Sequence, residues 1–163
     1  MTDKDFNTCV DNYSDGVYRF IVKNIGHEAD AQDIVQTAFE KLWVNRSKVE
    51  PKKAKSYLFT VAYHQMIDHI RKDKRNNTTD NFEEVKISIY QDANAELKQA
   101  LLSAINQLNP TQKSLVLLKD YEGYSYQEIG TIMDLSESQV KVYLHRARLL
   151  LKEKLAHLEK LRA

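Results

Sequence analysis

The stretch from Ser125 to Leu149, SYQEIGTIMDLSESQVKVYLHRARL, decides the fold of the C-terminal part of this chain. It contains two capping boxes, in which a serine is followed three positions later by Glu or Gln. Ser125 pairs with Glu128 in the first box, and Ser136 pairs with Gln139 in the second. A capping box marks the first turn of a helix. Two helices separated by a tight turn are therefore predicted, the arrangement of a helix-turn-helix.

The residues between the two boxes fit that motif. Asp134 occupies the turn position where helix-turn-helix motifs usually have glycine, and Asp is among the few other residues that tolerate a left-handed backbone. Gly130 is small enough to let the two helices approach closely. The predicted helices can pack through a shared apolar set, which consists of Ile129, Met133, Leu135, Val140 and Leu144.

The second helix of such a motif inserts its N-terminal end into the major groove of DNA. Lys141, His145 and Arg148 follow one another at helical spacing, and Ser138 lies near the same end. These side chains can contact base edges or phosphates. A plain helical hairpin with a charged exterior is the alternative, but two caps, a tight turn and a basic outward face coincide here.

A second helical pattern occurs earlier, in the sequence DAQDIVQTAFEKLW, residues 30–43. Its apolar residues recur at helical offsets. Asp30 is predicted to cap the helix. The opposite face is polar and acidic and includes Asp33 and Gln36, and an acidic face beside basic patches elsewhere in the chain favours a second partner besides nucleic acid.

Residues 55–75, KSYLFTVAYHQMIDHIRKDKR, form a third pattern. Ser56 is predicted to cap a helix that ends in the basic run 71–75. Basic residues at a helix C-terminus are often only solvated. Here Tyr57, Phe59 and Tyr63 precede them, and basic residues combined with aromatic side chains favour single-stranded nucleic acid.

Composition predicts an all-α fold of two small helical domains. The 163 residues are 42% hydrophobic and 29% charged, and they include only 4 Gly and 2 Pro, too few for the many turns of a β fold. Residues 76–94 lose the helical period and are rich in Asn, Thr and Asp. We expect an N-terminal domain over 1–76, a flexible linker over 77–94, and a helix-turn-helix domain over 95–163.

Several functional classes do not fit the sequence. The single cysteine, Cys9, cannot form an intramolecular disulfide, and no Cys/His cluster predicts a zinc site or another metal site. No signal peptide or membrane span is evident, so we expect a cytoplasmic protein that is not inserted in a membrane. A net charge of +1 predicts weak binding to DNA by the isolated chain.

Taken together, these motifs resemble the extracytoplasmic-function (ECF) sigma factors of bacterial RNA polymerase, over nearly the whole chain. Residues 30–43 are similar to region 2.2 of that family and residues 55–75 to regions 2.3 and 2.4. The segment from Leu108 through the helix-turn-helix is similar to region 4. The resemblance implies a transcription initiation factor that recognises promoters, has no catalytic residues and needs no cofactor.

The resemblance also implies partners for each surface. Asp33, Gln36 and Phe39 are expected to face the β′ clamp helices of core polymerase, although Phe39 can equally be a packed core residue. The opened minus-ten strand of promoter DNA is assigned to Tyr63, His64 and Arg71; His64 stands where many members have Asn. The minus-thirty-five duplex is assigned to Ser138, Lys141, His145 and Arg148. Region 4 is also expected to dock on the β flap, and an anti-sigma factor is a further expected partner.

Two other classes of protein are weaker alternatives. A conventional helix-turn-helix repressor needs a dimerisation surface or an effector pocket, which the first half does not suggest. A recombinase or nuclease needs a catalytic constellation. The candidates are Ser14 with Asp15 and His64 with His69, and the histidines are five positions apart, a poor spacing for sharing a metal on one helical face.

Overall fold

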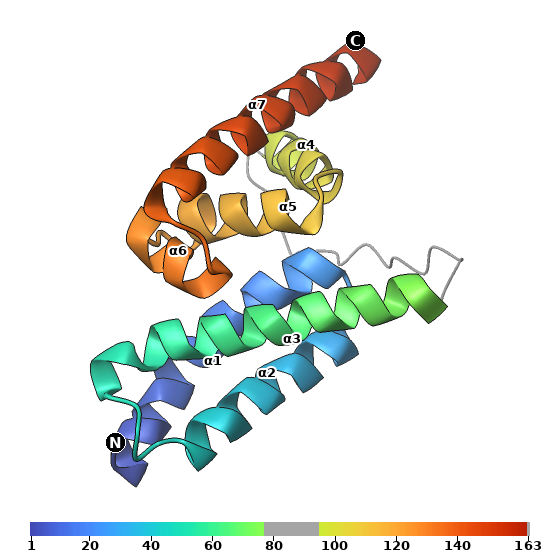
Figure 1. Ribbon diagram of the computed structural model, residues 1–163. Helices are drawn as coiled ribbons and strands as arrows, with labels where there is room; N and C mark the ends of the chain where they lie inside the picture. Colours follow the sequence, from blue (N-terminus) through green and yellow to red (C-terminus); the bar gives the residue numbers. More distant parts are fainter. Residues whose placement is uncertain (77–94, 163) are drawn as a thin grey trace.

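The computed structural model describes residues 1–76 and 95–162 of the chain, and every regular element among them is helical. This confirms the predicted all-α class. The predicted linker, 77–94, lies outside the described residues. In chain order the elements are α1 (Asp3–Ile25), α2 (Glu28–Val44), η1 (Pro51–Lys53), α3 (Ala54–Asn76), α4 (Ala95–Asn106), α5 (Pro110–Val116), η2 (Leu117–Tyr121), α6 (Tyr126–Met133) and α7 (Glu137–Arg162) (Figure 1).

Helices α1, α2 and α3 form an N-terminal bundle (Figure 1). Helix α1, which the sequence patterns did not reveal, begins at a capping box made by Thr2 and ends at Gly26 with a left-handed φ of 71°. Two predicted caps are wrong. Helix α2 already begins at Glu28, so Asp30 lies inside its first turn. A 3₁₀ turn that opens with Pro51 leads directly into α3, which therefore begins before Ser56.

The helix-turn-helix is confirmed by α6 and α7. The Ser125 hydroxyl accepts a hydrogen bond from the Glu128 amide at 3.1 Å, and the Ser136 hydroxyl accepts one from the Gln139 amide at 3.1 Å. Asp134 adopts the expected left-handed conformation, with φ 56° and ψ 51°. A Cβ atom on Gly130 would lie 2.6 Å from the Leu135 carbonyl oxygen, so the close approach here requires glycine.

Helix α5 leads into the helix-turn-helix through a π-helical turn, η2. Its start is capped by Asn109, and Pro110 occupies the first turn. At the other end the wider turn is closed by the Glu122 amide, which donates to the Leu117 carbonyl at 2.9 Å. Gly123, with φ 75°, then turns the chain towards α6.

The two halves of the chain pack against each other, α1 on α5 and α3 on α6 (Figure 1). We call this contact the joint. Buried residues of both halves belong to one hydrophobic core, and the rings of Phe59 and Tyr124 meet edge to face across the joint at 5.0 Å. At its border, Arg19 of α1 makes two hydrogen bonds of 2.9 Å to the carboxylate of Glu122.

Candidate functional site

Helix α7 presents a polar face to solvent at its N-terminal end. Val140, Leu144 and Ala147 are buried, which turns the opposite side of the helix outward. Ser138, Lys141 and His145 are exposed, as the sequence predicted. The Lys141 ammonium lies 3.6 Å from the carboxylate of Glu137, an exposed pair on the same helix. The outward face of this end therefore carries a hydroxyl, an ammonium and an imidazole group, all of which can form hydrogen bonds.

Arg148 lies differently from the other three predicted residues. Its guanidinium turns back to η2 and makes hydrogen bonds of 2.6 and 3.2 Å to the two carboxylate oxygens of Asp120. These bonds, and to a smaller degree the Tyr126 side chain, raise the pKa of Arg148. The guanidinium is therefore already engaged inside the protein, although it is still partly exposed.

Arg146 is an exposed arginine that the sequence analysis missed. No ion pair joins it to another residue in the described part of the chain. Because Val140, Leu144 and Ala147 define the buried side of α7, a helical wheel drawn on that stripe would have placed Arg146 beside His145 on the outward face. Exposed Val142 lies one turn earlier on this face.

The predicted strand-binding residues of α3 differ in their exposure. His64 and Arg71 are exposed, but Tyr63 is only 8% exposed. Burial raises the pKa of the Tyr63 hydroxyl, while Arg71 and a hydrogen bond with Thr111 act in the opposite direction. Thr111 belongs to α5, so this tyrosine interacts with a residue of the C-terminal half of the chain. The rings of Tyr63 and His64 are 5.7 Å apart.

The acidic face of α2 is exposed at Asp33 and Gln36, as predicted. The Gln36 amide donates to Glu40 at 3.2 Å, one turn further along. Phe39 is only partly buried, but its ring packs against the ring of Phe6 at 6.3 Å. Two of the three predicted residues therefore face solvent, and Phe39 belongs to the packing between α1 and α2.

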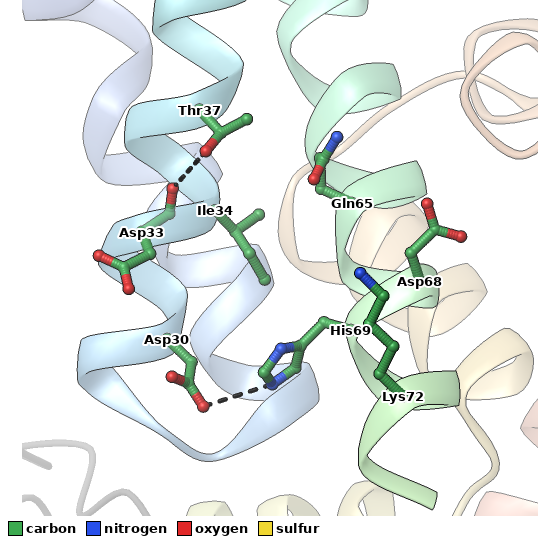
Figure 2. A pocket seen from close by; sticks show the side chains of 8 residues that line it. All are labelled: Asp30, Asp33, Ile34, Thr37, Gln65, Asp68, His69 and Lys72. Carbon is green, nitrogen blue, oxygen red and sulfur yellow. Dashed lines mark hydrogen bonds and ion pairs between the residues drawn. The ribbon is translucent and has the colours of Figure 1, made fainter. Parts of the chain in front are cut away.

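A shallow pocket of about 430 Å³ separates the acidic face of α2 from α3 (Figure 2). Asp30 and Asp33 line it from α2, and Asp68, His69 and Lys72 line it from α3. The His69 Nε2 atom lies 3.3 Å from Asp30 and 3.4 Å from Asp73. His69 of α3 therefore lies against Asp30 of α2 beside the predicted protein-binding face, although its Nε2 atom makes no hydrogen bond with the described residues.

A second pocket, of about 450 Å³, lies in the connection between α2 and α3. The Tyr57 hydroxyl accepts a hydrogen bond from the Asn45 amide at 3.2 Å on its wall. Lys48 and Lys53 bring positive charge to the same pocket, Glu50 brings one negative charge, and Val49 lies beside them. An aromatic ring, an aliphatic side chain and two ammonium groups suit an unstacked base and its phosphate. Sequence analysis recorded the aromatic Tyr57 but not this pocket.

Residues 1–76 and 95–162 contain no group of three or more His, Cys, Asp or Glu side chains arranged to hold a metal ion. No helix in those ranges is long and apolar enough to cross a membrane.

Comparison with protein families gives two matches in this order along the chain. Residues 9–76 match Sigma-70 region 2, and residues 98–151 match Sigma-70, region 4. The ECF RNA polymerase sigma factor SigM of Bacillus subtilis is 29% identical over 146 residues, which cover 86% of this chain and 88% of SigM. SigW of the same organism is 29% identical over 170 residues, covering 94% of this chain and 90% of SigW.

Solved structures show the same fold. The sigma factor RpoE of Bartonella quintana, in complex with the anti-sigma factor NepR, superposes with a TM-score of 0.80 at 25% sequence identity. The match covers 94% of this chain and 98% of the RpoE chain. CnrH in complex with the cytosolic domain of CnrY has a TM-score of 0.70 at 21% identity, over 93% of this chain and 88% of its own.

Proposed function

Because this chain belongs to the sigma-70 family, as a sigma factor of the extracytoplasmic-function type, we propose a role in promoter recognition for each of its exposed faces. The protein binds core RNA polymerase, recognises promoter DNA and promotes transcription initiation. The observation that carries this assignment is the order of regions 2 and 4, which together match about three quarters of the chain.

The outward face of α7 reads the minus-thirty-five duplex in this proposal. Lys141 and His145 are exposed at the end of the helix that enters the major groove in such motifs. Ser138 supports them from the first turn, and Arg146 adds a positive charge. Arg148 is bound to Asp120 and acts indirectly, by fixing α7 against η2.

Helix α3 and the connection between α2 and α3 bind the opened minus-ten strand. Exposed His64 and Arg71 contact bases and phosphates, and Tyr63 stacks on a base once it is uncovered. The pocket beside Tyr57 receives a base that has left the duplex, since only an unstacked base can enter it. Strand capture therefore extends from α3 to the preceding connection.

The polar face of α2 binds the β′ clamp helices through Asp33 and Gln36. Both side chains are exposed and have no role in the core, so their position leaves them free for a partner. Phe39 contributes indirectly, because its contact with Phe6 holds α2 against α1. The C-terminal half adds a second contact with the polymerase, on the β flap.

The arrangement in Figure 1 has to open before both promoter elements can be bound. Elements near positions minus ten and minus thirty-five are about 25 base pairs apart, or roughly 85 Å of duplex at 3.4 Å per pair. A compact chain of this length has a radius of gyration of about 15 Å. We therefore propose that binding to core polymerase separates the two halves at the joint. Residues 77–94, if fully extended, would reach about 60 Å.

The remaining assignments follow from this role. We propose two domains, 1–76 and 95–163, joined by 77–94. We also propose that the protein acts in the cytoplasm, where its polymerase is, without catalytic activity, cofactor or metal of its own. An anti-sigma factor is a proposed further partner, because the similar RpoE was solved in complex with one.

The proposal that α3 captures the opened strand and α7 reads the duplex can be tested on two promoter templates. One template is a normal duplex, and the other carries a mismatched, already open minus-ten region. We expect the Tyr63→Ala/His64→Ala variant to initiate poorly on the duplex and to recover on the mismatched template. The Lys141→Ala/His145→Ala variant should lose promoter affinity on both, because good base contacts in the major groove are worth about 1–3 kcal/mol each.

Two controls make this experiment decisive. Each variant is first assayed for co-purification with core polymerase, so that a loss of core binding is not mistaken for a loss of DNA contact. Helical content by circular dichroism checks the fold. If the mismatch rescues both variants to the same degree, or neither, then duplex reading and strand capture are not divided between α7 and α3.

A further inference from the structure

Residues 121–124 of the C-terminal half, with the sequence YEGY, contact three positively charged side chains of the N-terminal half. These side chains are Arg19 and Lys23 of α1 and Lys55 of α3, and we call them the cradle. The segment begins at the last residue of η2 and leads towards α6. One side of the joint is therefore a set of cations from two helices that meets a single short segment.

The two tyrosines of the segment each lie under an ammonium group. The Lys23 ammonium lies 4.1 Å from the centre of the Tyr121 ring, and the Lys55 ammonium lies 4.5 Å from the centre of the Tyr124 ring. Both distances are within the range of a cation–π contact. The Tyr124 ring also meets the ring of Phe59 edge to face at 5.0 Å. Each ring is therefore bound through its π system by the N-terminal half.

Glu122, between the two tyrosines, compensates the positive charge of the cradle. Its carboxylate accepts two hydrogen bonds of 2.9 Å from the Arg19 guanidinium. Burial lowers the pKa of Lys23, and the neighbouring Arg19 lowers it further, while Glu122 acts in the opposite direction. Asp15 is a second, smaller source of negative charge beside Arg19. When the joint opens, the two cations of α1 therefore lose their main compensating charge.

The segment presents the same kinds of group as a single nucleic-acid strand. Two aromatic rings flank one carboxylate, as two bases flank a phosphate. A guanidinium group binds a carboxylate and a phosphate through the same pair of parallel hydrogen bonds. Every base, like a tyrosine ring, has a π-face that can stack or meet a cation. The cradle therefore has the chemistry to bind single-stranded nucleic acid, and residues 121–124 occupy it in the closed protein.

The cradle continues the surface of α3 that we propose for the opened strand. Lys55 lies two residues before Tyr57, which lines the pocket in the connection between α2 and α3. Phe59 and Tyr63 follow Lys55 at intervals of four residues, so these three side chains lie on one side of the helix. A strand that leaves the pocket can follow this side of α3 only after residues 121–124 have withdrawn.

We propose that residues 121–124 mimic a nucleic-acid strand within the chain, and that the cradle binds single-stranded nucleic acid once the two halves separate. Arg19 then binds a phosphate in place of the Glu122 carboxylate. Lys23 and Lys55 lie over neighbouring bases. In the closed protein the segment excludes the strand, so the free protein binds single strands weakly. This inference rests on the proposed opening of the joint.

The mimic can be disabled without changing the cradle. Tyr121→Leu/Glu122→Gln removes one ring and the carboxylate, and the full chain is titrated with a fluorescent single-stranded oligonucleotide and with the duplex of the same sequence. We expect this variant to bind the single strand about fivefold more tightly than the unmodified protein, because one exposed ion pair holds the segment in place. The duplex should gain less, because its bases are stacked. Fluorophores on α2 and α7 report whether the joint has opened, and Tyr124→Ala is added if it has not.

The cradle itself is tested in this opened background, where the ion pair across the joint is already absent. Arg19→Gln/Lys23→Gln should abolish the gain in affinity for the single strand. The slope of log affinity against log salt concentration should also become shallower, by about 0.7 for each cation removed. The control Lys4→Gln/Lys160→Gln removes the same charge from exposed positions outside the joint and should keep the gain. Circular dichroism and the unfolding midpoint identify any variant that has lost its fold.

The outcomes separate the mimic from the opening on which it rests. If the joint opens and the affinity for the single strand does not rise, or if the cradle variant keeps the gain, the mimic is wrong. An equal gain for duplex would mean a general anion-binding surface. Binding of a peptide with the sequence of residues 119–126, but not of the oligonucleotide, would mean that the cradle takes an acidic protein segment instead. If the fluorophores report an open joint in the unmodified protein, the closed arrangement itself fails.

Discussion

The two helices that we propose to bind DNA, α3 and α7, differ in how far their proposed contact residues are exposed. On α7, Lys141 and His145 are exposed and need no rearrangement to meet a duplex. On α3, Tyr63 is 8% exposed and interacts with Thr111 of the other half. The difference matches the order of events at a promoter, where duplex is available from the start and a single strand appears only on opening. In the proposed mechanism, strand capture by α3 requires the joint to open, whereas duplex reading by α7 does not.

The π-helical turn η2 contacts two different parts of the protein, the helix-turn-helix and helix α1. Lys119 and Asp120 face Tyr126 and Arg148 of the helix-turn-helix. The next residue, Tyr121, lies under the Lys23 ammonium of α1 at 4.1 Å, and Glu122 follows directly with its bonds to Arg19. A π-helical turn changes the direction of successive side chains relative to an α-helix, which allows neighbours in sequence to serve two partners.

Among substitutions that should change the difference in exposure between α3 and α7, we expect the largest effect from Tyr124, which lies in the middle of the joint. Tyr124→Ala removes a ring that is 2% exposed and packs on Phe59, and should lower the free energy of unfolding by about 3–5 kcal/mol. It should also expose Tyr63 to solvent more than it exposes residues of α7. Chemical denaturation and footprinting of tyrosines measure the two effects.

The control at the same position is Tyr124→Phe. The buried Tyr124 hydroxyl has no hydrogen-bond partner among residues 1–76 and 95–162, so removing it should be neutral or stabilising by about 1 kcal/mol. A Phe variant as unstable as the Ala variant would show that the hydroxyl, and not the ring, holds the joint.

The second-largest effect is expected from Lys113, which should make the free energy of unfolding depend on pH. Its buried ammonium donates to the Asn24 carbonyl of α1 at 3.2 Å. Burial lowers the pKa of Lys113 from 10.5 to about 8. Between those values the unfolded chain binds more protons than the folded one, so this group makes stability rise with pH, by on the order of 3 kcal/mol in total. Below pH 8 the lysine is charged in both states and adds no slope.

Lys113→Met should flatten that rise, because the replacement has no titrating group. The measurement is the free energy of unfolding at several values between pH 7 and 10.5, with Lys119→Met as the control. If the free energy of unfolding of the variant still rises with pH as much as that of the unmodified protein, Lys113 remains solvated and the joint is looser than described.

The smallest effect is expected at the border of the joint. Arg19→Ala removes the bonds to Glu122, but Arg19 is 49% exposed, so the pair is worth only about 1 kcal/mol. The open fraction of the free protein should rise about fivefold. The distance between fluorophores on α2 and α7 reports this shift, and the exchanged pair Arg19→Glu/Glu122→Arg should reverse most of it. If the exchange fails to restore the distance, the charges do not attract across the joint.

The sequence was sufficient for features that depend on local chemistry. The capping serines of α6 and α7, the left-handed Asp134 and close-packed Gly130 are set by residues a few positions apart, and the structure has them as predicted. The caps predicted at Asp30 and Ser56 failed because their helices begin earlier in the chain. The burial of Tyr63 and the pairing of Arg148 with Asp120 could not be predicted from such local patterns. Each depends on a residue more than twenty positions away, Thr111 in one case and Asp120 in the other. Such contacts leave no periodic signal in a single sequence.

The most direct test of the closed arrangement is to lock the joint. Cysteines replacing Arg19 and Glu122 are joined by a short cleavable bismaleimide, while Cys9, at 5% exposure, stays protected from the reagent. We predict that the linked protein fails to initiate transcription from its promoter, even on a template with an open minus-ten region, and that cutting the linker restores initiation. Each single-cysteine variant, treated identically, should remain active. A linked protein that initiates as well as the cut one would contradict the separation of the two halves.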